Sequence, residues 1–432
     1  MTTTTYSAPT TTTTARERRH IVAAATAGNM LEFYDFTVYS YFALTIAHQF
    51  FPKEQSQTAA LLAFAVFAIG FVSRPIGGIL LGYYADRKGR RPALTLTILL
   101  MGLGSAIIGL SPSYATIGIA APFLITVARL VQGFAQGGEF GAATTTLLET
   151  GSEKSRAYRA SWQLASQGAA SLLGAAVSAV LHFSLSEDAM NSWGWRIPFL
   201  IGVLIVPIGL YLRRHLKDEE PSTAAATSHV HTPFAPRLVI NWFLCVFSIM
   251  GMTISSYILM YYIPTYSIQY LGMPATLSSI VAICAAVISL VMSPIFGALS
   301  DKFKRRKPIA IIGRAVLIVL LYPCFWLMNH YTSLSNMMLL IIVLMLFYTM
   351  GSTPAYALMP ENFPKKVRAT YLASAYAVSV ALFGGTAQLV SSWLINATGN
   401  TMAPAWYMIA SVTLSLIAVS LLRETGHEDL QQ

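Results

Sequence analysis

Twelve long apolar runs dominate the chain, separated by short segments that carry charges, proline or glycine. Each run is long enough for an α-helix to cross the hydrocarbon core of a bilayer, which takes about 20 residues. The pattern therefore predicts an all-α membrane protein with twelve transmembrane helices. The predicted spans are residues 21–50, 57–84, 93–110, 117–149, 156–184, 196–214, 238–270, 276–300, 308–329, 335–360, 367–396 and 403–423.

The composition supports this interpretation and argues against a soluble enzyme. Of the 432 residues, 55% are hydrophobic and only 11% are charged, which leaves too little polar surface to cover a soluble fold of this size. Cys245, Cys284 and Cys324 each fall inside an apolar run, without the paired spacing of a disulfide framework or a metal site. We therefore expect no metal and no cofactor.

The charges predict how the chain is oriented. Arg16, Arg18 and Arg19 precede the first run, which continues past Tyr41 and so is too long for a cleaved signal peptide. If the N-terminus is cytoplasmic, most of the 28 basic residues fall in cytoplasmic segments, as the positive-inside rule requires. The net charge of +10 then reflects topology and not a nucleic-acid surface. We expect both termini in the cytoplasm.

Two short motifs occur once in each half of the chain. Residues 82–91 (GYYADRKGRR) recur as residues 297–306 (GALSDKFKRR), and an acid–arginine pair with a spacing of seven recurs as well. The pairs are Glu149 with Arg156 and Glu361 with Arg368. Such repeats predict two six-helix bundles. The predicted parts are a disordered cytoplasmic tail (1–20), an N-terminal bundle (21–214), a cytoplasmic linker (215–236), a C-terminal bundle (237–423) and a cytoplasmic tail (424–432).

Residues 82–91 resemble the signature loop of the major facilitator superfamily, Gly-x-x-x-Asp-Arg-x-Gly-Arg-Arg. The resemblance covers the whole chain and implies a transporter with two pseudo-symmetric six-helix bundles. Lys302 and Lys304 depart from the second copy of the loop, where Arg and Gly are usual, which bears on how tightly the C-terminal gate closes. The segments that resemble the metabolite:proton symporter family are 28–36, 74–77, 129–134, 137–139 and 193–199, and those that resemble its citrate and tricarballylate branch are 161–163, 166–167, 264–266 and 383–385.

The signature loop predicts a latch between the two halves. An aspartate at a helix end can accept hydrogen bonds from arginines and from the N-terminus of a neighbouring helix, and such a latch must break when the halves rock. Gly82 and Gly89 would permit close approach and a tight loop. The alternative is that these charges only anchor the topology. The candidate gate residues are Gly82, Asp86, Arg87, Gly89, Arg90, Glu149, Arg156, Asp301, Arg305, Glu361 and Arg368.

A few ionisable residues fall at membrane depth, where a charge is costly unless it is paired or faces water. They are Glu32, Asp35, Arg74, Arg129, Glu139 and Arg314. Arg74 and Arg129 lie near the predicted midplane, and a guanidinium can match a carboxylate with two hydrogen bonds, so these two favour an anionic substrate. The alternative is that they only neutralise the acids in permanent ion pairs. Arg314 lies six residues into its helix, from where it can reach the cytoplasm.

Buried carboxylates are suited to carrying protons. Glu139 and Asp35 are the first candidates for proton coupling, and Glu32 is the next. Helical spacing predicts that these acids belong to two polar stripes. One stripe consists of Arg129, Gln132, Gln136 and Glu139, and the other consists of Asn29, Glu32 and Asp35.

The C-terminal half has no acid at this depth but many hydroxyls and amides. Tyr257 and Tyr261 share a helix face, as do Gln163 and Gln167 in the first half. These groups would hydrogen-bond a substrate. The substrate-binding candidates are Arg74, Arg129, Asn29, Gln132, Gln163, Gln167, Tyr257 and Tyr261.

We expect a packing role for one set of glycines and no transport role for three histidines. Glycines spaced by four predict a close helix-packing seam. They are Gly133, Gly137 and Gly141. Three histidines lie toward outer helix ends, where we expect solvated or interfacial roles. They are His48, His182 and His330.

The sequence as a whole predicts proton-coupled uptake of a small organic anion, a di- or tricarboxylate such as citrate or tricarballylate, by alternating access. The alternative with the same resemblance is a zwitterionic osmolyte such as proline or betaine. No enzyme is expected, because neither a phosphate-binding loop nor a His-Glu-x-x-His zinc motif occurs. The expected partners are the organic anion, protons and the lipid bilayer, with no nucleic acid, for a monomer in the bacterial inner (plasma) membrane.

Overall fold

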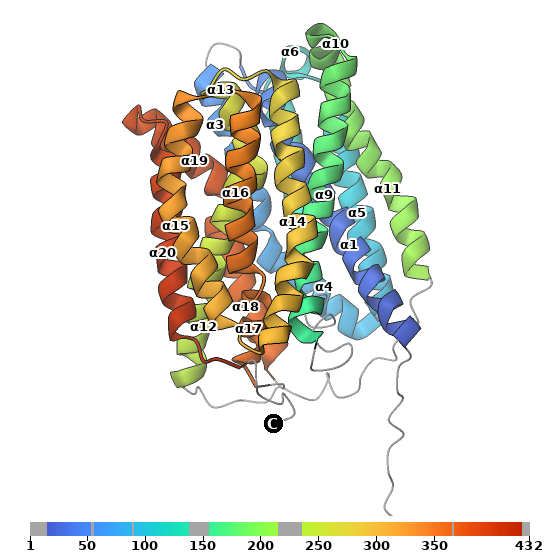
Figure 1. Ribbon diagram of the computed structural model, residues 1–432. Helices are drawn as coiled ribbons and strands as arrows, with labels where there is room; N and C mark the ends of the chain where they lie inside the picture. Colours follow the sequence, from blue (N-terminus) through green and yellow to red (C-terminus); the bar gives the residue numbers. More distant parts are fainter. Residues whose placement is uncertain are drawn as a thin grey trace, which may run out of the picture.

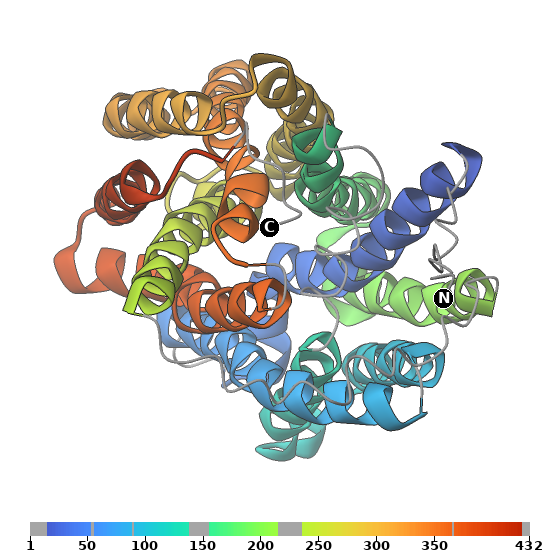
Figure 2. The same ribbon diagram turned by 90° about the horizontal axis from the view of Figure 1, so that it is seen from below.

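The computed structural model describes residues 15–52, 56–88, 90–137, 155–214, 236–364 and 367–425, and the regular structure within these ranges is entirely helical (Figure 1). The all-α prediction is therefore confirmed. Figure 2 looks along the long helices from the end where α1 begins and α20 ends, which we call the termini end. In this view the first half of the chain (blue to green) and the second half (yellow to red) gather on opposite sides.

The described part of the first half contains seven long helices and several short ones. The long helices are α1 (Ala15–Tyr41), α3 (Ser56–Val72), α4 (Arg74–Lys88), α5 (Arg90–Leu110), α7 (Ala120–Gln136), α9 (Arg156–Ser184) and α11 (Ile197–Arg214). The short ones are α2 (Ala43–Phe50), α6 (Tyr114–Ile117), α10 (Glu187–Ser192) and the 3-10 turn η3 (Gly194–Arg196).

The second half follows the same plan, but two of its helices pass through π-helical turns. Its helices before the second π-turn are α12 (Pro236–Ser256), the π-turn η4 (Tyr257–Tyr262), α13 (Ile263–Gln269), α14 (Ala275–Phe303), α15 (Lys307–His330), α16 (Leu334–Ser352), α17 (Ala355–Glu361) and α18 (Arg368–Ser379). The rest are the π-turn η5 (Val380–Gly384), α19 (Ala387–Thr398) and α20 (Ala403–Leu421).

The described helices account for a protein that crosses the membrane many times. Nine of them are long and apolar enough to span a bilayer, when α3 is counted with α4, α16 with α17 and each π-turn with its flanks as one helix. α1, α7 and α11 pack against these nine and complete the order of the twelve predicted spans. α1 is the least apolar of the three, because it begins with charged residues and carries Glu32 and Asp35 in its middle.

The two halves meet along α9 and α14. A Cβ on Gly168 of α9 would lie 2.7 Å from the backbone nitrogen of Leu290, and one on Gly297 of α14 would lie 2.7 Å from the carbonyl oxygen of Ala157. Both distances are shorter than carbon can approach, so glycine is required for the two backbones to come this close. The interface is therefore tight at two separate levels of the bundle.

A second close approach joins α7 to α3 and α4. A Cβ on Gly133 would overlap the carbonyl oxygen of Gly70, and one on Gly137 would overlap the carbonyl oxygen of Arg74. The predicted packing seam is thus confirmed for Gly133 and Gly137, whereas Gly141 lies outside the described residues. This seam brings the start of α4 against the C-terminal end of α7.

Replacing Gly133 with alanine should destabilise the bundle, because the new methyl group would push α3 away from α7. Overpacking of this kind costs about 3 kcal/mol or more. The measurement is the thermal unfolding midpoint in detergent, with Gly82→Ala as the matched control, since no heavy atom lies within 4 Å of a Cβ at Gly82. An unchanged midpoint for Gly133→Ala would show that the seam is not tight.

Candidate functional site

Arg129 lies on α7 and is completely buried. Its Nη1 donates to Oε1 of Gln132 at 2.8 Å, and its guanidinium carbon lies 4.5 Å from the ring centre of Phe36, 4.2 Å from that of Tyr39 and 5.0 Å from that of Phe67. Aromatic faces attract a cation and offset part of the cost of burying it. Nε and Nη2 have no hydrogen-bond partner among the described residues, so two donors remain for another group.

Arg74 stands beside Arg129 at the first position of α4, where the chain bends after α3. Its guanidinium carbon lies 4.0 Å from the ring centre of Phe71 and 4.7 Å from that of Phe36, the ring that Arg129 also contacts. Its Nη2 donates to Gln136 of α7, while its Nε has no partner within the described part of the chain. We call Arg74 and Arg129 the arginine pair.

The arginine pair makes no ion pair within 4.0 Å to any carboxylate of the described residues. The permanent ion pairs with Glu32 and Asp35 that the sequence left open are therefore absent from this structure. Glu139, the third acid considered, lies outside the described residues. Two fixed positive charges thus sit close together in a buried setting with free donors.

Asp35 lies behind the arginine pair, on the face of α1 that packs against α5 and α11. A Cβ on Gly202 of α11 would lie 2.5 Å from its Oδ1, and its side chain interacts with Ser105 of α5 and, at longer range, with Arg129. Ser105 Oγ accepts a hydrogen bond from Gln132 Nε2 at 3.0 Å. Gln132 and Ser105 therefore form a polar path between Arg129 and Asp35, whose Oδ1 has no hydrogen-bond partner among the described residues.

The predicted polar stripe on α1 is wrong in one respect. Asn29 does not share a face with Asp35 but points to α9, where its Oδ1 accepts from Gln163 Nε2 at 3.0 Å and its Nδ2 donates to Ser166. Steps of three residues lag a full helical turn by about 60° each, so six residues separate the two side chains by about 120°. Asn29 and Gln163 therefore bond each other, while Gln163 Oε1 has no partner among the described residues. Glu32 contributes its backbone carbonyl to Gln136 at 2.9 Å.

The second half contributes tyrosines from the π-turn η4. The Tyr257 ring centre lies 5.7 Å from that of Phe71 and 5.3 Å from that of Tyr261, and the Tyr257 hydroxyl is within electrostatic range of both members of the arginine pair. Tyr261 Oη has no hydrogen-bond partner among the described residues. A π-turn adds a residue to the helix and is frequent at functional sites. Here it turns these side chains toward the first half.

Other groups predicted to bind substrate lie beside the same interface. Gln167 of α9 interacts with Tyr356 of α17 and not with the arginine pair. The π-turn η5 brings Gly385 against Phe71, since a Cβ there would overlap the phenylalanine ring. The arginine pair is thus covered from the second half by Tyr257 and by the backbone that follows η5.

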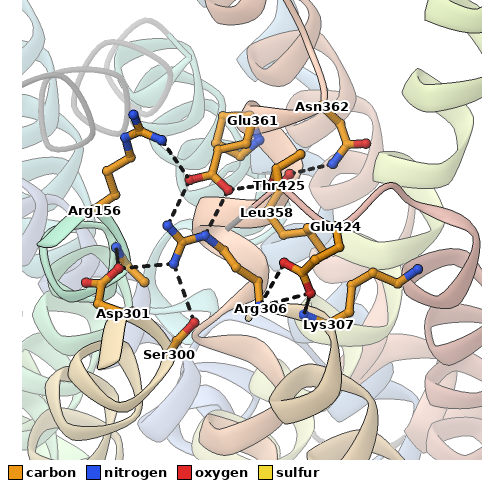
Figure 3. A network of polar contacts seen from close by, with 12 residues as sticks. Arg156, Ser300, Asp301, Arg306, Lys307, Leu358, Glu361, Asn362, Glu424 and Thr425 are labelled. Carbon is orange, nitrogen blue, oxygen red and sulfur yellow. Dashed lines mark hydrogen bonds and ion pairs between the residues drawn. The ribbon is translucent and has the colours of Figure 1, made fainter. Parts of the chain in front are cut away.

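A cluster at the termini end joins the two halves through charge (Figure 3). Glu361, the last residue of α17, receives Arg306 Nε at 2.8 Å and Arg306 Nη2 at 2.9 Å, and its Oε1 lies 3.6 Å from Arg156 Nη1. Arg306 belongs to the second half and Arg156 begins α9 of the first. A single buried carboxylate therefore connects both halves.

Asp301 provides the second connection at this end. Its Oδ1 accepts from the backbone nitrogen of Ala157 at 3.0 Å and from Arg306 Nη1 at 3.1 Å, while its Oδ2 accepts from the backbone nitrogen of Tyr158 at 2.8 Å. It thus caps the N-terminus of α9 from across the interface, where the helix dipole favours a negative charge. We call the four residues Arg156, Asp301, Arg306 and Glu361 the polar bridge.

Neighbouring carboxylates keep Arg306 of the polar bridge charged. Burial of Arg306 disfavours its charge, but the adjacent Glu361 and Asp301 carboxylates outweigh burial and raise the pKa of its guanidinium above the ordinary value. Arg306 therefore stays positive at every physiological pH.

Lys304 shows how the second loop tolerates the loss of its usual glycine. Its φ is 52° and its ψ is 24°, and it is the one non-glycine residue with positive φ in the described ranges. The left-handed conformation costs a side-chain-bearing residue about 1–2 kcal/mol. The loop nevertheless keeps the backbone path of a glycine, and the bridge behind it is complete.

Comparison with known proteins agrees with this architecture. The family model for the Major Facilitator Superfamily matches residues 25–379 and 276–431. The chain belongs to this superfamily of membrane transporters. It is therefore a transporter and not an enzyme, as the sequence predicts.

Relatives in this superfamily carry two kinds of name. The chain is 34% identical over 409 residues to a citrate-proton symporter of Klebsiella pneumoniae, covering 94% of this chain and 92% of the relative. It is 35% identical over 404 residues to one of Salmonella typhi, with 92% coverage of both. It is also 34% identical over 402 residues to a candidate proline/betaine transporter of Staphylococcus aureus strain MSSA476, covering 91% and 86%.

Solved structures support the superfamily fold. A crystal structure of a D-xylose-proton symporter matches with a TM-score of 0.77 at 21% identity, covering 95% of this chain and 98% of that one. An inward-open structure of the xylose transporter from E. coli matches with a TM-score of 0.75. The predicted architecture of two six-helix bundles is thereby confirmed.

Several superfamily gate positions differ from the prediction. Arg305 is exposed, and its neighbour Arg306 occupies the bridge. Arg368 Nε donates to the carbonyl oxygens of Pro360 and Phe363 and not to Glu361.

The signature loop of the first half makes fewer described contacts. A Cβ on Gly82 would meet no heavy atom within 4 Å, so close approach does not require glycine there in this structure. Arg87 lies over the ring of its neighbour Tyr83, 4.4 Å from the ring centre. The remaining gate candidates lie outside what the structure describes, entirely or in their side chains. They are Asp86, Gly89, Arg90 and Glu149.

Arg314 also differs from expectation. It does not reach toward the helix end but is buried, with Nε donating to Ser415 Oγ at 3.1 Å and Nη1 donating to the carbonyl oxygens of Ala310 and Gly351. Gly351 lies at the C-terminal end of α16, where a carbonyl oxygen lacks an intrahelical donor, and α17 begins at Ala355. The arginine therefore supports the junction of α16 and α17.

Sequence reasoning missed the segment that follows α20. Glu424 accepts from the backbone nitrogens of Arg306 and Lys307 at 2.9 Å each, and Thr425 Oγ1 donates to Glu361 Oε2 at 2.6 Å. These two residues, assigned above to a tail, are part of the bundle and orient the polar bridge (Figure 3). No local sequence pattern predicts such contacts, because they join residues more than 60 positions apart.

Thr425→Val should lower the stability of the closed bridge, because it removes one hydroxyl from a buried carboxylate while keeping the side-chain volume. A hydrogen bond to a charged group contributes about 1.5–3 kcal/mol. Thermal unfolding in detergent measures the loss. Thr413→Val is the matched control, since its hydroxyl bonds only its own helix at Ile409. Equal midpoints for the two variants would remove Thr425 from the bridge.

Proposed function

We propose that this transporter is a proton-coupled symporter that takes up a small organic anion, a di- or tricarboxylate such as citrate or tricarballylate, by alternating access. The observation that carries the proposal is the arginine pair, buried and without a carboxylate partner in the described part of the chain. Leaving buried charged donors unsatisfied costs free energy, which a bound carboxylate would recover through charge-assisted hydrogen bonds.

The chemistry of the pair suits a carboxylate more than a cation. Both guanidinium groups already occupy the aromatic faces of Phe36, Tyr39, Phe67 and Phe71, which are the surfaces that a quaternary ammonium would need. Tyr257 and Tyr261 add hydroxyls from the second half. A substrate held by both halves would be released to one side when they rock apart.

We assign the polar bridge to the cytoplasmic gate. The positive-inside distribution of the sequence supports a cytoplasmic termini end, and opening there would separate Glu361 from Arg156 and Asp301 from the start of α9. The relatives are bacterial, which supports the plasma membrane as the location. One chain contains both halves, so we propose that a monomer is sufficient.

Asp35 is our leading candidate for proton coupling. The path through Ser105 and Gln132 links it to Arg129, so a substrate anion that binds Arg129 changes the electrostatic setting of Asp35. Glu32 is the next candidate, and Glu139 stays a prediction from the sequence. The proton would neutralise Asp35 while the anion neutralises Arg129, so that the loaded site carries less charge across the cycle.

The second candidate function is uptake of a zwitterion such as proline or betaine, which the Staphylococcus aureus relative favours. Proteoliposomes under an imposed pH gradient, supplied with di- and tricarboxylates in one arm and betaine or proline in the other, separate the two. Concentrative uptake of a carboxylate that competes with other carboxylates supports the first proposal. Uptake of betaine alone would replace it with the second.

Arg129→Lys should reduce carboxylate affinity about 100-fold, because lysine keeps the charge but loses the paired donors, and a charged hydrogen bond contributes about 1.5–3 kcal/mol. Substrate binding by calorimetry in detergent measures the change. Arg196→Lys is the control: this arginine also lies over an aromatic ring, that of Trp195, but away from the pair. Wild-type affinity in Arg129→Lys would take Arg129 out of the site.

Asp35→Asn should abolish uptake against a concentration gradient while leaving substrate exchange between equal pools intact. The amide is isosteric but does not titrate in the physiological range, so transport continues without coupling. Counterflow and gradient-driven uptake in proteoliposomes measure the two modes. Retention of full concentrative uptake would exclude Asp35 as the coupling residue.

A further inference from the structure

A small cavity lies between the two halves at the end of the bundle opposite the termini. Tyr41, Ser178 and His182 line it from the first half, and Pro264 and Ser279 line it from the second. His182 is half-buried in the last turn of α9. It is the one charged or readily titratable side chain in this lining besides the Tyr41 phenol, since no acidic or other basic residue of the described chain borders the cavity.

The hydrogen bonding of His182 fixes which nitrogen can take up a proton. Nδ1 lies 2.8 Å from the carbonyl oxygen of Ser178, and a carbonyl only accepts, so Nδ1 carries the hydrogen. In the neutral ring the lone pair is then on Nε2. A proton arriving at Nε2 leaves the bond to Ser178 intact. The ring of Phe42 stacks on the imidazole at 5.8 Å and limits its rotation.

Ser178 also connects this imidazole to the other half. Its Oγ lies 3.1 Å from Ser279 Oγ on α14 and 3.3 Å from His182 Nδ1. A second contact across the interface nearby is Tyr41 Oη, which donates to the carbonyl oxygen of Met260 at 3.1 Å. The closure of this end therefore depends on neutral hydrogen bonds, in contrast to the ionic polar bridge at the termini end.

We propose that His182 is the proton-accepting residue of the outer gate, and that protonation of its Nε2 favours separation of the two halves at this end. The inference rests on the proposed proton-coupled transport. The closed cavity offers an imidazolium no counter-ion other than the C-terminal end of the α9 dipole, whereas an open cavity hydrates it. A proton that binds the open form more tightly shifts the equilibrium toward that form.

External acid then acts twice. It supplies the proton gradient that drives uptake, and it opens the outer end of the empty transporter to receive substrate. His182 is in this sense a positioning residue for the cycle, distinct from the coupling acid near the arginine pair. Its effect is measurable without any substrate.

The test is solvent access to the cavity at different pH values without substrate. In a chain whose Cys245, Cys284 and Cys324 are replaced by alanine, Ala282→Cys places a thiol on the α14 side of the cavity. Its modification by a membrane-impermeant thiol reagent added outside is followed in proteoliposomes from pH 8 to pH 5.5. The same measurement in the background of His182→Gln cancels the intrinsic pH dependence of the thiol.

The labelling rate of the chain with His182, divided by that of the His182→Gln chain, should rise at least about 5-fold as the pH falls. A 5-fold effect is at the lower end of typical couplings between two sites. A ratio that stays flat overturns the proposal. His330→Gln is the matched control: its Nδ1 also lies 2.8 Å from the carbonyl oxygen four residues earlier, at the same end of the bundle, but it is exposed and stacks on Trp326. The His330→Gln variant should be labelled at the same rate as the chain that keeps both histidines, at each pH.

Ser279→Ala gives an independent arm that leaves the imidazole in place. Removing the bond to Ser178 should raise labelling at pH 8 above that of the chain with Ser279 intact at the same pH. Unchanged labelling at pH 8 would contradict the link between Ser178 and closure. Because no substrate is present, failure of the carboxylate proposal would leave these results standing, and failure here would leave the carboxylate proposal standing.

Discussion

Two guanidinium groups are buried next to each other with no ion-paired acid among the described residues, and this constraint shapes the first half of the protein. The free energy cost is offset locally: four aromatic rings supply their faces, and Gln132 and Gln136 supply acceptors. The glycine seam between α7 and α3–α4 brings the backbones close enough for both arginines to reach the same ring. Within the described part of the chain, Arg129 Nε and Nη2 and Arg74 Nε remain without a hydrogen-bond partner.

The polar bridge is arranged so that it can open at modest cost. Glu361 is bound most closely by Arg306 of its own half, through two bonds of 2.8 and 2.9 Å, and less closely by Arg156 of the other half at 3.6 Å. When the halves separate, the carboxylate loses its weaker partner and keeps the stronger one, so no buried charge is left alone. Glu424 and Thr425 hold this arrangement from the side of the second half and do not depend on the first.

The sequence predicted the features that depend on composition and on hydrophobic periodicity. It predicted fewer of those that depend on where an individual side chain points. Twelve spans, two repeats and a pair of buried arginines follow from hydropathy and from the scarcity of charge within apolar runs. The sequence could not tell Arg305 from Arg306, because the choice depends on the left-handed turn at Lys304. It likewise misplaced Asn29, because two steps of three residues fall about 120° short of two full helical turns. It gave no signal for the contact of Thr425 with Glu361, which joins distant parts of the chain.

The two ends of the bundle are closed by different chemistry, and the difference suits a one-way response to acid. At the termini end the contacts are ionic, and the carboxylates beside Arg306 raise the pKa of its guanidinium, so this arginine stays charged. At the opposite end, serine hydroxyls and one imidazole make neutral contacts that a single proton can change. Under our proposal, a pH difference across the membrane would therefore act on one gate and spare the other. Proton binding would then bias the empty carrier toward the side from which substrate is taken up.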